Sequence, residues 1–264
     1  MKAKFPKFRG IYPGIHHKKL KTYFTNFKTR ESANRLNDIC KNRKVFFICF
    51  TNRCGSNLVC QAIASSGSIR QPGENLNYNT IINHSNLRGF KDYAEYLCWL
   101  IEQESEPKGT IGIKSSVDQL IQLFNYGLLE KMGNIKLIMV SRKNTLKQAI
   151  SWAVAEQTQQ WTSSQSTEID PEAVNLDCDN ILKLAGSINQ QNAMFKLAFE
   201  LIGKTPLEIK YEDFVKSPEK HMIAISEHIE TTSIEYKSEK LAYRKQATNK
   251  NEEFYNILKN KYSI

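Results

Sequence analysis

Short apolar runs recur along the chain, and each is bounded by polar turns. The runs at 44–50 and 135–141 are the most clearly apolar, and a third occupies 110–116. Runs of this length and composition predict buried β-strands. A fourth strand is predicted at 206–214, in the stretch PLEIKYEDF.

The segments between these runs carry apolar residues at helical spacing. They predict helices at 58–63, 93–101, 117–124, 146–154 and 181–202. Asn144 or Thr145 is a suitable N-cap for the fourth helix, and Ser217 followed by Pro218 predicts the start of another. Strands that alternate with helices predict an α/β fold of the P-loop type, with a parallel sheet flanked by helices on both faces.

The 264 residues carry a net charge of +10, but this charge is unevenly distributed. Residues 1–44 contain 13 Lys and Arg against 2 Asp and Glu, whereas the remaining residues contain 24 against 25. We therefore divide the chain into a basic N-terminal arm, 1–44, and a nearly neutral domain, 45–264. Such an arm is suited to contact an anionic surface. The alternative is a solvated tail or an extension that packs on the domain, and aromatic residues such as Phe24 and Phe27 indicate that part of it packs.

Several classes of site and location are not expected from the sequence. No apolar run is long enough to cross a membrane, and the N-terminus lacks the apolar region of a secretion signal. The six cysteines are scattered without a C-x-x-C pair, so neither a zinc site nor a disulfide framework is predicted. We therefore expect a cytoplasmic protein with reduced thiols and no bound metal.

The stretch FTNRCGSNLVC (50–60) leads from the first strand into the first helix. In an open parallel sheet, ligands bind beyond the carboxyl ends of the strands, and the backbone N–H groups at a helix start hold anions. Gly55 allows the backbone to approach closely, and Ser56 and Asn57 add side-chain donors. Arg53 supplies a positive charge with a planar fork that suits oxyanions.

This turn departs from the loop that binds nucleoside triphosphates. That loop requires G-x-x-x-x-G-K-[ST], but no glycine stands five residues before Gly55 and the lysine is missing. A second strand ending in an Asp for Mg²⁺ is also missing, since Ser141 and Arg142 stand there. These departures favour transfer of a group that needs less neutralisation than phosphoryl, such as sulfuryl. Taken alone, the turn is equally compatible with a strand–turn–helix that has no function.

A second polar group follows the strand at 135–141. Arg142 stands at the end of this strand, and Ser151 lies nine residues later, away from the apolar stripe of the next helix. Together they are able to bind a second phosphate, distinct from an anion in the turn. The alternative is that Arg142 is a surface residue and Ser151 a neutral helix position.

As a set, these segments resemble PAPS-dependent sulfotransferases, specifically the bacterial trehalose 2-sulfotransferase-like carbohydrate sulfotransferases. The family's R-S-G-S-T-L-L resembles RCGSNLV (53–59), with Cys54 for Ser and Asn57 for Thr, and its Pro-x-Glu resembles PGE (72–74). Its Arg with a following Q-A-x-S resembles Arg142 and QAIS (148–151), and its A-x-Q-T-x-x-W resembles AEQTQQW (155–161). Its Tyr-Glu-Asp resembles YED (211–213), and its R-x-Q-A-rich segment resembles YRKQATNK (243–250). The resemblance spans residues 45–260 in order.

The resemblance implies that the donor is PAPS, 3′-phosphoadenosine 5′-phosphosulfate, which carries two separate anionic ends. Its phosphosulfate would lie in the turn made by Arg53, Cys54, Gly55, Ser56, Asn57 and Leu58. Its 3′-phosphate would contact Arg142 and Ser151, with Arg244 and Lys245 adding to this second site and Tyr211 near the nucleotide.

The resemblance also implies catalytic roles for two of these positions. Glu74 would be the general base that takes the proton of the acceptor hydroxyl, with His84 as an alternative base. Arg53 and the amides of the turn would stabilise the leaving oxygen. Transfer would proceed in line and without a metal ion.

The partners and the rival functions are less closely defined by the sequence. The family implies a hydroxyl of a carbohydrate or glycolipid as acceptor, and a homodimer. The polar loop 162–173 is a candidate substrate lid or partner contact. A P-loop kinase that uses ATP and Mg²⁺ is one alternative, and a degenerate protein that binds nucleotide without catalysis is another. A module that binds nucleic acid through the arm is disfavoured by the near-neutral domain, so no nucleic acid is expected as a partner.

Overall fold

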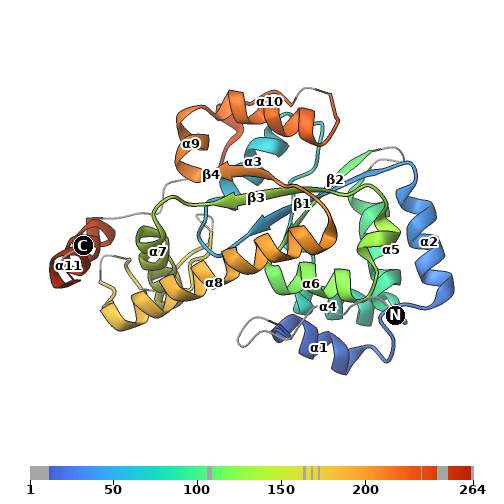
Figure 1. Ribbon diagram of the computed structural model, residues 1–264, viewed down its shortest axis with the longest axis horizontal. Helices are drawn as coiled ribbons and strands as arrows, with labels where there is room; N and C mark the ends of the chain where they lie inside the picture. Colours follow the sequence, from blue (N-terminus) through green and yellow to red (C-terminus); the bar gives the residue numbers. More distant parts are fainter. Residues whose placement is uncertain are drawn as a thin grey trace.

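Four parallel strands form the centre of the protein (Figure 1). The computed structural model describes residues 12–105, 109–162, 165–167, 169–171, 173–232, 234–242 and 249–262. The strands are β1 (Lys44–Phe50), β2 (Thr110–Ser115), β3 (Lys136–Ser141) and β4 (Leu207–Lys210). All four predicted strands are confirmed, but the fourth is shorter than expected because the chain turns into the helix α9 (Tyr211–Lys216) at Tyr211.

The strand order, β2-β1-β3-β4, decides where a ligand can bind. β1 pairs with β2 on one side and with β3 on the other, in both cases in parallel. The chain therefore passes from β1 to β2 on one side of β1, and later crosses over to β3 on the other side of β1. In open parallel sheets the crevice at such a reversal of strand order is the usual ligand site. The turn after Phe50 lies at this reversal.

Helices cover both faces of the sheet, so the predicted α/β class is confirmed (Figure 1). One face packs against α3 (Ser56–Ser65), α9 and α10 (Pro218–His228). The opposite face packs against α5 (Tyr93–Glu104), α6 (Val117–Asn125) and α8 (Cys178–Ile202). Alternate residues of β1 point to the two sides: Phe46 and Ile48 belong to the first core, Val45 and Phe47 to the second.

The described part of the N-terminal arm packs into the second core. It forms α1 (Ile15–Tyr23) and α2 (Arg30–Cys40), and α1 lies beside α4 (Tyr78–Arg88) and α6. Leu20 and Leu36 are fully buried in this core together with Phe24 and Phe27. The arm and the domain thus share one hydrophobic core over the described residues, while the boundary at 44 stays a prediction.

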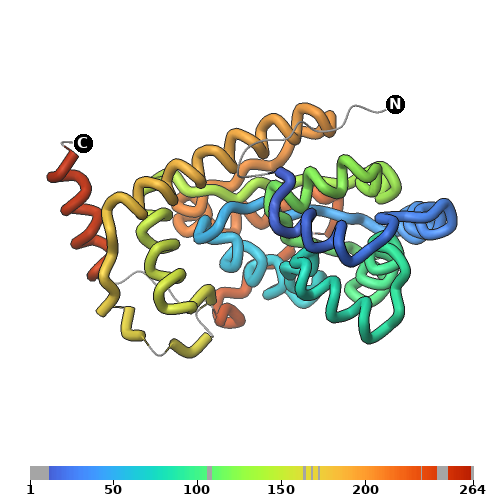
Figure 2. The backbone as a smooth tube through the Cα atoms, turned by 90° about the horizontal axis from the view of Figure 1, so that it is seen from below, coloured from blue at the N-terminus to red at the C-terminus, as the bar shows by residue number. Residues whose placement is uncertain are grey.

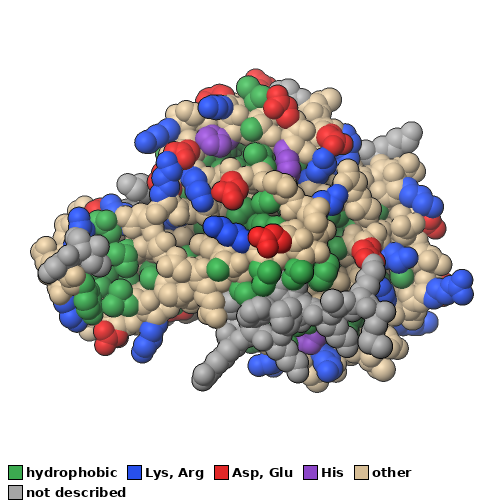
Figure 3. Space-filling view, in the orientation of Figure 1, with side chains coloured by type: hydrophobic (Ala, Val, Ile, Leu, Met, Phe, Trp, Pro, Cys, Tyr) green, Lys and Arg blue, Asp and Glu red, His purple; other side chains and the backbone are tan. Residues whose placement is uncertain are grey.

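A third, smaller core lies at the other end of the molecule. It joins α7 (Thr145–Thr158), α8 and α11 (Asn249–Tyr262), and Figure 2 shows α11 and α2 at opposite ends. On the face in Figure 3, charged side chains of both signs are intermixed, and hydrophobic side chains gather where α11 lies. Asn144 is the N-cap of α7, as predicted, and accepts a hydrogen bond from the backbone N–H of Lys147. Ser217, in contrast, makes no side-chain capping bond to α10.

Two short 3₁₀ helices, η1 (Leu129–Met132) and η2 (Ser238–Lys240), complete the secondary structure of the described residues.

All six cysteines are free thiols, and five of them are buried. Within the described ranges there is no group of three or more His, Cys, Asp or Glu side chains arranged to hold a metal ion. The described helices also include none that is both long enough and apolar enough to span a bilayer.

The buried side chain of Asp92 connects the arm to the domain, and this connection is testable. Its carboxylate accepts hydrogen bonds from the N–H of Thr29 and the hydroxyl of Ser32 at the start of α2. It also accepts from the N–H of Glu95 in the first turn of α5. Asp92→Ala should lower the free energy of unfolding by about 3 kcal/mol, because three hydrogen bonds to a buried carboxylate are lost. Urea denaturation measures this loss.

The matched control is Asp38→Ala, which removes an exposed carboxylate paired with Lys41. It should change the free energy of unfolding by less than about 0.5 kcal/mol. Equal, small effects of the two substitutions would contradict the role of Asp92.

Candidate active site

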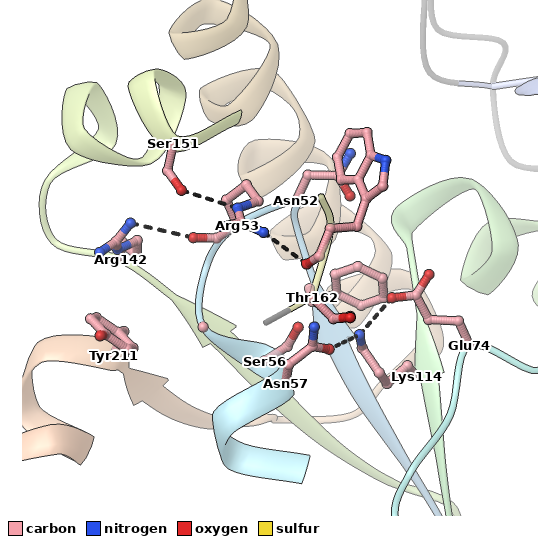
Figure 4. A pocket seen from close by; sticks show the side chains of 13 residues that line it. Asn52, Arg53, Ser56, Asn57, Glu74, Lys114, Arg142, Ser151, Thr162 and Tyr211 are labelled. Atoms are coloured by element: carbon pink, nitrogen blue, oxygen red, sulfur yellow. Dashed lines mark hydrogen bonds and ion pairs between the residues drawn. The ribbon is translucent and has the colours of Figure 1, made fainter. Parts of the chain in front are cut away.

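One pocket lies beyond the carboxyl ends of β1, β2 and β3 (Figure 4). It has about 860 Å³ of empty space, part of it open to solvent. Its lining residues come from segments far apart in sequence: Phe50, Asn52, Arg53, Gly55, Ser56, Asn57, Glu74, Lys114, Arg142, Ser151, Trp161, Thr162 and Tyr211. The pocket therefore unites the turn after β1 with residues that follow β3 and β4.

The turn after β1 is sharply curved, and α7 fixes it from outside. Arg53 and Gly55 both have left-handed backbone conformations, with φ of 62° and 94°, and α3 starts directly afterwards. The buried side-chain amide of Gln148 donates to the hydroxyl of Thr51 (2.8 Å) and to the carbonyl oxygen of Asn52 (2.7 Å). The first N–H groups of α3 have no acceptor within their own helix, so this curvature presents donors for an anion.

Tyr211 closes the turn from the side of β4. A Cβ atom added to Gly55 would lie 2.3 Å from Cδ2 of Tyr211, so this glycine is required by close packing as well as by its φ. The guanidinium carbon of Arg142 lies 4.7 Å from the centre of the Tyr211 ring. Glu212 lies 4.0 Å from Nε of Arg142 and accepts from the backbone N–H of Lys143, which fixes the chain as it leaves β3.

Two arginines meet at one end of the pocket. Nε of Arg53 donates to the hydroxyl of Ser151 (3.0 Å), and its Nη1 donates to the carbonyl oxygen of Trp161 (2.8 Å). Nη1 of Arg142 lies 3.5 Å from the carbonyl oxygen of Arg53. The geometry thus gathers two guanidinium groups and a hydroxyl within reach of one another, which is a suitable donor set for a phosphate.

A buried lysine occupies the other end of the pocket. Nζ of Lys114, on β2, donates to Oδ1 of Asn57 and to Oε1 of Glu74, both at 2.6 Å. The ammonium also lies 4.4 Å from the centre of the Phe50 ring. The Lys114 side chain is only 4% exposed, whereas that of Glu74 is 52% exposed. Lys114 therefore connects the start of α3 to a carboxylate that solvent and ligands can reach.

The backbone around Glu74 is held against β2. Gly73 forms a parallel bridge with this strand, and its carbonyl oxygen accepts from the backbone N–H of Lys114 (2.9 Å). The carbonyl oxygen of Asn75 accepts from the hydroxyl of Tyr96 (2.6 Å). Glu74 is consequently presented from a fixed segment, although it follows a Pro-Gly turn that could otherwise be flexible.

Most of the predicted site residues lie together in this pocket. Those that line it are Arg53, Gly55, Ser56, Asn57, Glu74, Arg142, Ser151 and Tyr211. Cys54 and Leu58 do not line it; their side chains are buried in the core beneath the turn. Burial raises the pKa of the Cys54 thiol, so the group stays protonated rather than acting as a nucleophile. Arg244 and Lys245 lie outside the described residues.

The alternative base, His84, is not part of the pocket lining. Its ring lies on α4, 4.5 Å from the ring of Trp99. Trp161 and Thr162, where the polar loop 162–173 begins, line the pocket, while the role of this loop as a substrate lid or partner contact stays a prediction. The side chain of Gln165 accepts from the backbone N–H groups of both residues, at 2.7 and 2.9 Å.

Sequence reasoning overlooked Lys114 as a site residue, although a signal for it was present. It is the one charged residue in the apolar stretch TIGIKS (110–115), at the carboxyl end of a buried strand. A lysine is almost never fully buried unless it is paired, so its position in a buried strand predicts a partner or a function. Gln148 was noted as part of a motif, but its role in holding the turn depends on its contacts with Thr51 and Asn52 in three dimensions.

The close packing of Gly55 against Tyr211 predicts a specific loss of stability. Gly67 also has a left-handed φ, of 80°, but a Cβ atom there would meet nothing within 4 Å. Gly67→Ala should therefore cost about 1 kcal/mol from the backbone alone. Gly55→Ala should cost about 1–3 kcal/mol more, because the ring of Tyr211 must also shift. Chemical denaturation of both variants measures the difference, and equal losses would show that Tyr211 does not restrict this position.

Comparison with known proteins supports a function for this arrangement. Residues 115–261 match the Stf0 sulphotransferase family, a stretch that includes Arg142, Ser151 and Tyr211 and begins directly after Lys114. A search of the curated proteins gave no match. The match covers more than half of the 264 residues, so the chain belongs to the Stf0 sulphotransferase family and is a sulfotransferase.

Proposed function

We propose that the protein transfers a sulfuryl group from PAPS to a hydroxyl of a carbohydrate or glycolipid. The observation that carries this proposal is that one pocket has two cationic ends, and that a carboxylate lines the pocket at one of these ends. Arg53, Arg142 and Ser151 form one end, while Lys114 and Glu74 form the other beside the turn. PAPS has a matching distribution, with a 3′-phosphate separate from its 5′-phosphosulfate.

The 3′-phosphate fits the end that is built by α7 and the loop after β3. Its oxygens would accept from Ser151 and from the guanidinium of Arg142, which is pre-oriented by the Tyr211 ring. Arg53 already donates to Ser151 and is close enough to share in this contact. The 5′-phosphosulfate would lie over the start of α3, against the N–H groups that follow Gly55.

The chemical step then requires a base near the acceptor hydroxyl, on the side of the sulfur opposite the leaving oxygen. The acceptor oxygen attacks sulfur, its proton passes to the carboxylate of Glu74, and a new S–O bond forms. The bond between sulfur and the bridging oxygen breaks, and its electron pair stays on the 5′-phosphate of the product, 3′-phosphoadenosine 5′-phosphate. Oε1 of Glu74 accepts a hydrogen bond from Lys114, so Oε2 would be the atom that takes the proton.

The acceptor class is the least constrained part of the proposal. It rests on the resemblance to carbohydrate sulfotransferases, and Trp161 and Thr162 at the pocket edge are the residues best placed to select an acceptor. A metal-free step is favoured by Arg142, which stands after β3 where a nucleoside triphosphatase would have an Asp for Mg²⁺.

The donor class is tested by ligand-dependent thermal stability. The proposal predicts that 3′-phosphoadenosine 5′-phosphate raises the melting temperature at micromolar concentration, because it binds the folded state alone. ATP with Mg²⁺ should have little effect, since it lacks the 3′-phosphate. Stabilisation by ATP with Mg²⁺ alone would instead favour the kinase alternative.

Arg142→Ala should weaken nucleotide binding. Loss of a charged hydrogen-bond donor to the 3′-phosphate should raise the Kd for 3′-phosphoadenosine 5′-phosphate roughly 10- to 100-fold in calorimetry. The matched control is Arg88→Ala, which removes another arginine stacked on an aromatic ring, Trp99, also at 4.7 Å, but outside the pocket. Its Kd should equal that of the wild type. An unchanged affinity in Arg142→Ala would remove Arg142 from the donor site.

Glu74→Gln should separate catalysis from donor binding. The amide cannot accept the proton, so turnover with an acceptor should fall roughly 100-fold or more, while the Kd for the product nucleotide changes little. Glu230→Gln is the control, because Glu230 also pairs with a strand lysine, Lys136, but at the opposite end of the sheet. Full turnover by Glu74→Gln would show that another group takes the proton.

A further inference from the structure

The sulfuryl group of the proposed donor would need a cation beside the turn, and Arg53, which the sequence suggests for this charge, is hydrogen-bonded at the other end of the pocket. In nucleotide-binding loops, a lysine of the loop reaches the group that is transferred, and that lysine is missing after Gly55. Arg53 is directed to Ser151 and to the carbonyl oxygen of Trp161. We infer that Lys114, from the neighbouring strand β2, replaces the loop lysine and contacts the sulfuryl group of the donor. This inference rests on the proposed function.

The position of the ammonium is the first argument. During in-line transfer, sulfur moves from an oxygen held at the start of α3 to an acceptor oxygen held at Glu74. Nζ of Lys114 lies 2.6 Å from Oδ1 of Asn57, at the start of α3, and 2.6 Å from Oε1 of Glu74. It therefore bonds to a residue at each end of the path and lies beside the space between them, as Figure 4 shows.

The hydrogen-bonding capacity of the ammonium is the second argument. A lysine ammonium has three N–H donors. Asn57 and Glu74 accept two of them, and no other acceptor for Lys114 is present in the part of the chain that the structure describes. Because Lys114 lines the pocket, its third donor is available to a ligand oxygen.

The burial of the lysine is the third argument. Its side chain is 4% exposed, and it stands between Ile113 and Ser115, which are both fully buried. Burial of an ammonium is costly, and an ion pair seldom stabilises a fold more than well-packed apolar residues would. Here the partner carboxylate of Glu74 is half exposed, so the pair contributes little to stability. A charge in this position is better explained by an anionic substrate.

The same contacts explain how the charge becomes available during the reaction. In the resting site the ammonium is balanced by the Glu74 carboxylate. When Glu74 takes the acceptor's proton it becomes neutral, so the charge of Lys114 is then balanced only by the sulfuryl and phosphate oxygens. Lys114 donates hydrogen bonds throughout and keeps its own protons. The stabilisation is therefore greatest as charge develops on the leaving oxygen, which is the condition for catalysis.

Lys114→Met tests this inference by equilibrium binding, without a known acceptor. Methionine is similar in length and apolar, so it suits the buried position, and the half-exposed Glu74 carboxylate can be hydrated. The Kd for PAPS should rise roughly 10- to 100-fold, because a charged hydrogen bond to the sulfuryl group is lost. The Kd for 3′-phosphoadenosine 5′-phosphate, which lacks that group, should change less than about threefold. Calorimetry with freshly purified PAPS measures both values.

Two controls distinguish contact with the donor from mere positioning of Glu74. Glu74→Gln breaks the same ion pair from its other side, and it should keep the wild-type ratio of the two Kd values. Lys136→Met removes the lysine of the ion pair with Glu230 at the opposite end of the sheet, and it should change neither Kd.

Three results would overturn the inference. Equal weakening of both ligands in Lys114→Met would indicate that the lysine only shapes the turn, and unchanged binding of both would indicate that it does not reach the donor. If Glu74→Gln raised the Kd for PAPS relative to that for 3′-phosphoadenosine 5′-phosphate, as Lys114→Met does, Lys114 would act through Glu74. A wild-type protein that binds neither ligand would instead contradict the proposed donor, and the inference would fall with it.

Discussion

The course of the backbone between Phe50 and Ser56 is the constraint on which the rest of the site depends. Two left-handed residues, Arg53 and Gly55, turn the chain from the sheet into α3. Gln148 holds the start of this turn, and Tyr211 packs against its glycine. Because these contacts come from α7 and from the end of β4, the turn takes its shape only when the sheet has assembled. The candidate anion site thus depends on the whole parallel sheet rather than on a local motif.

The distribution of charge in the pocket follows from the strand order. β1 lies between β2 and β3, so the turn receives Lys114 from one neighbour and Arg142 from the other. The two cations lie on opposite sides of the turn, which suits a donor with two separated anionic ends. On the β3 side Arg142 lies 4.0 Å from the carboxylate of Glu212, which does not line the pocket, whereas on the β2 side the pocket-lining carboxylate of Glu74 is hydrogen-bonded to Lys114. This difference is the reason for the proposal that the acceptor enters beside Glu74. Under the proposed function, nucleotide binding and acceptor activation would therefore depend on residues beside different strands.

Much of the fold could be predicted from the sequence, because buried strands and amphipathic helices have a strong local pattern. The four strands and the helices α3, α5, α6, α7 and α8 all lie where the apolar spacing indicated. The fourth strand was predicted too long, because YEDF (211–214) forms the start of a helix, with Tyr211 packed against Gly55. The lone charge of Lys114 in a buried strand was a signal in the sequence, but its partners could not be identified, because Asn57 and Glu74 are 57 and 40 residues away. The local pattern of apolar residues predicts helices and strands. The site, in contrast, depends on which strands lie next to one another in the sheet.

The central claim is that this pocket moves a sulfuryl group and not a phosphoryl group, and the most direct measurement is of product formation. The protein is incubated with PAPS and a panel of carbohydrates in the presence of EDTA, and 3′-phosphoadenosine 5′-phosphate is quantified by chromatography. The account predicts that this product forms faster when a suitable carbohydrate is present, and that the sulfated carbohydrate appears in equal amount despite the chelator. Absence of PAPS turnover, together with Mg²⁺-dependent transfer of phosphate from ATP to the same panel, would contradict it.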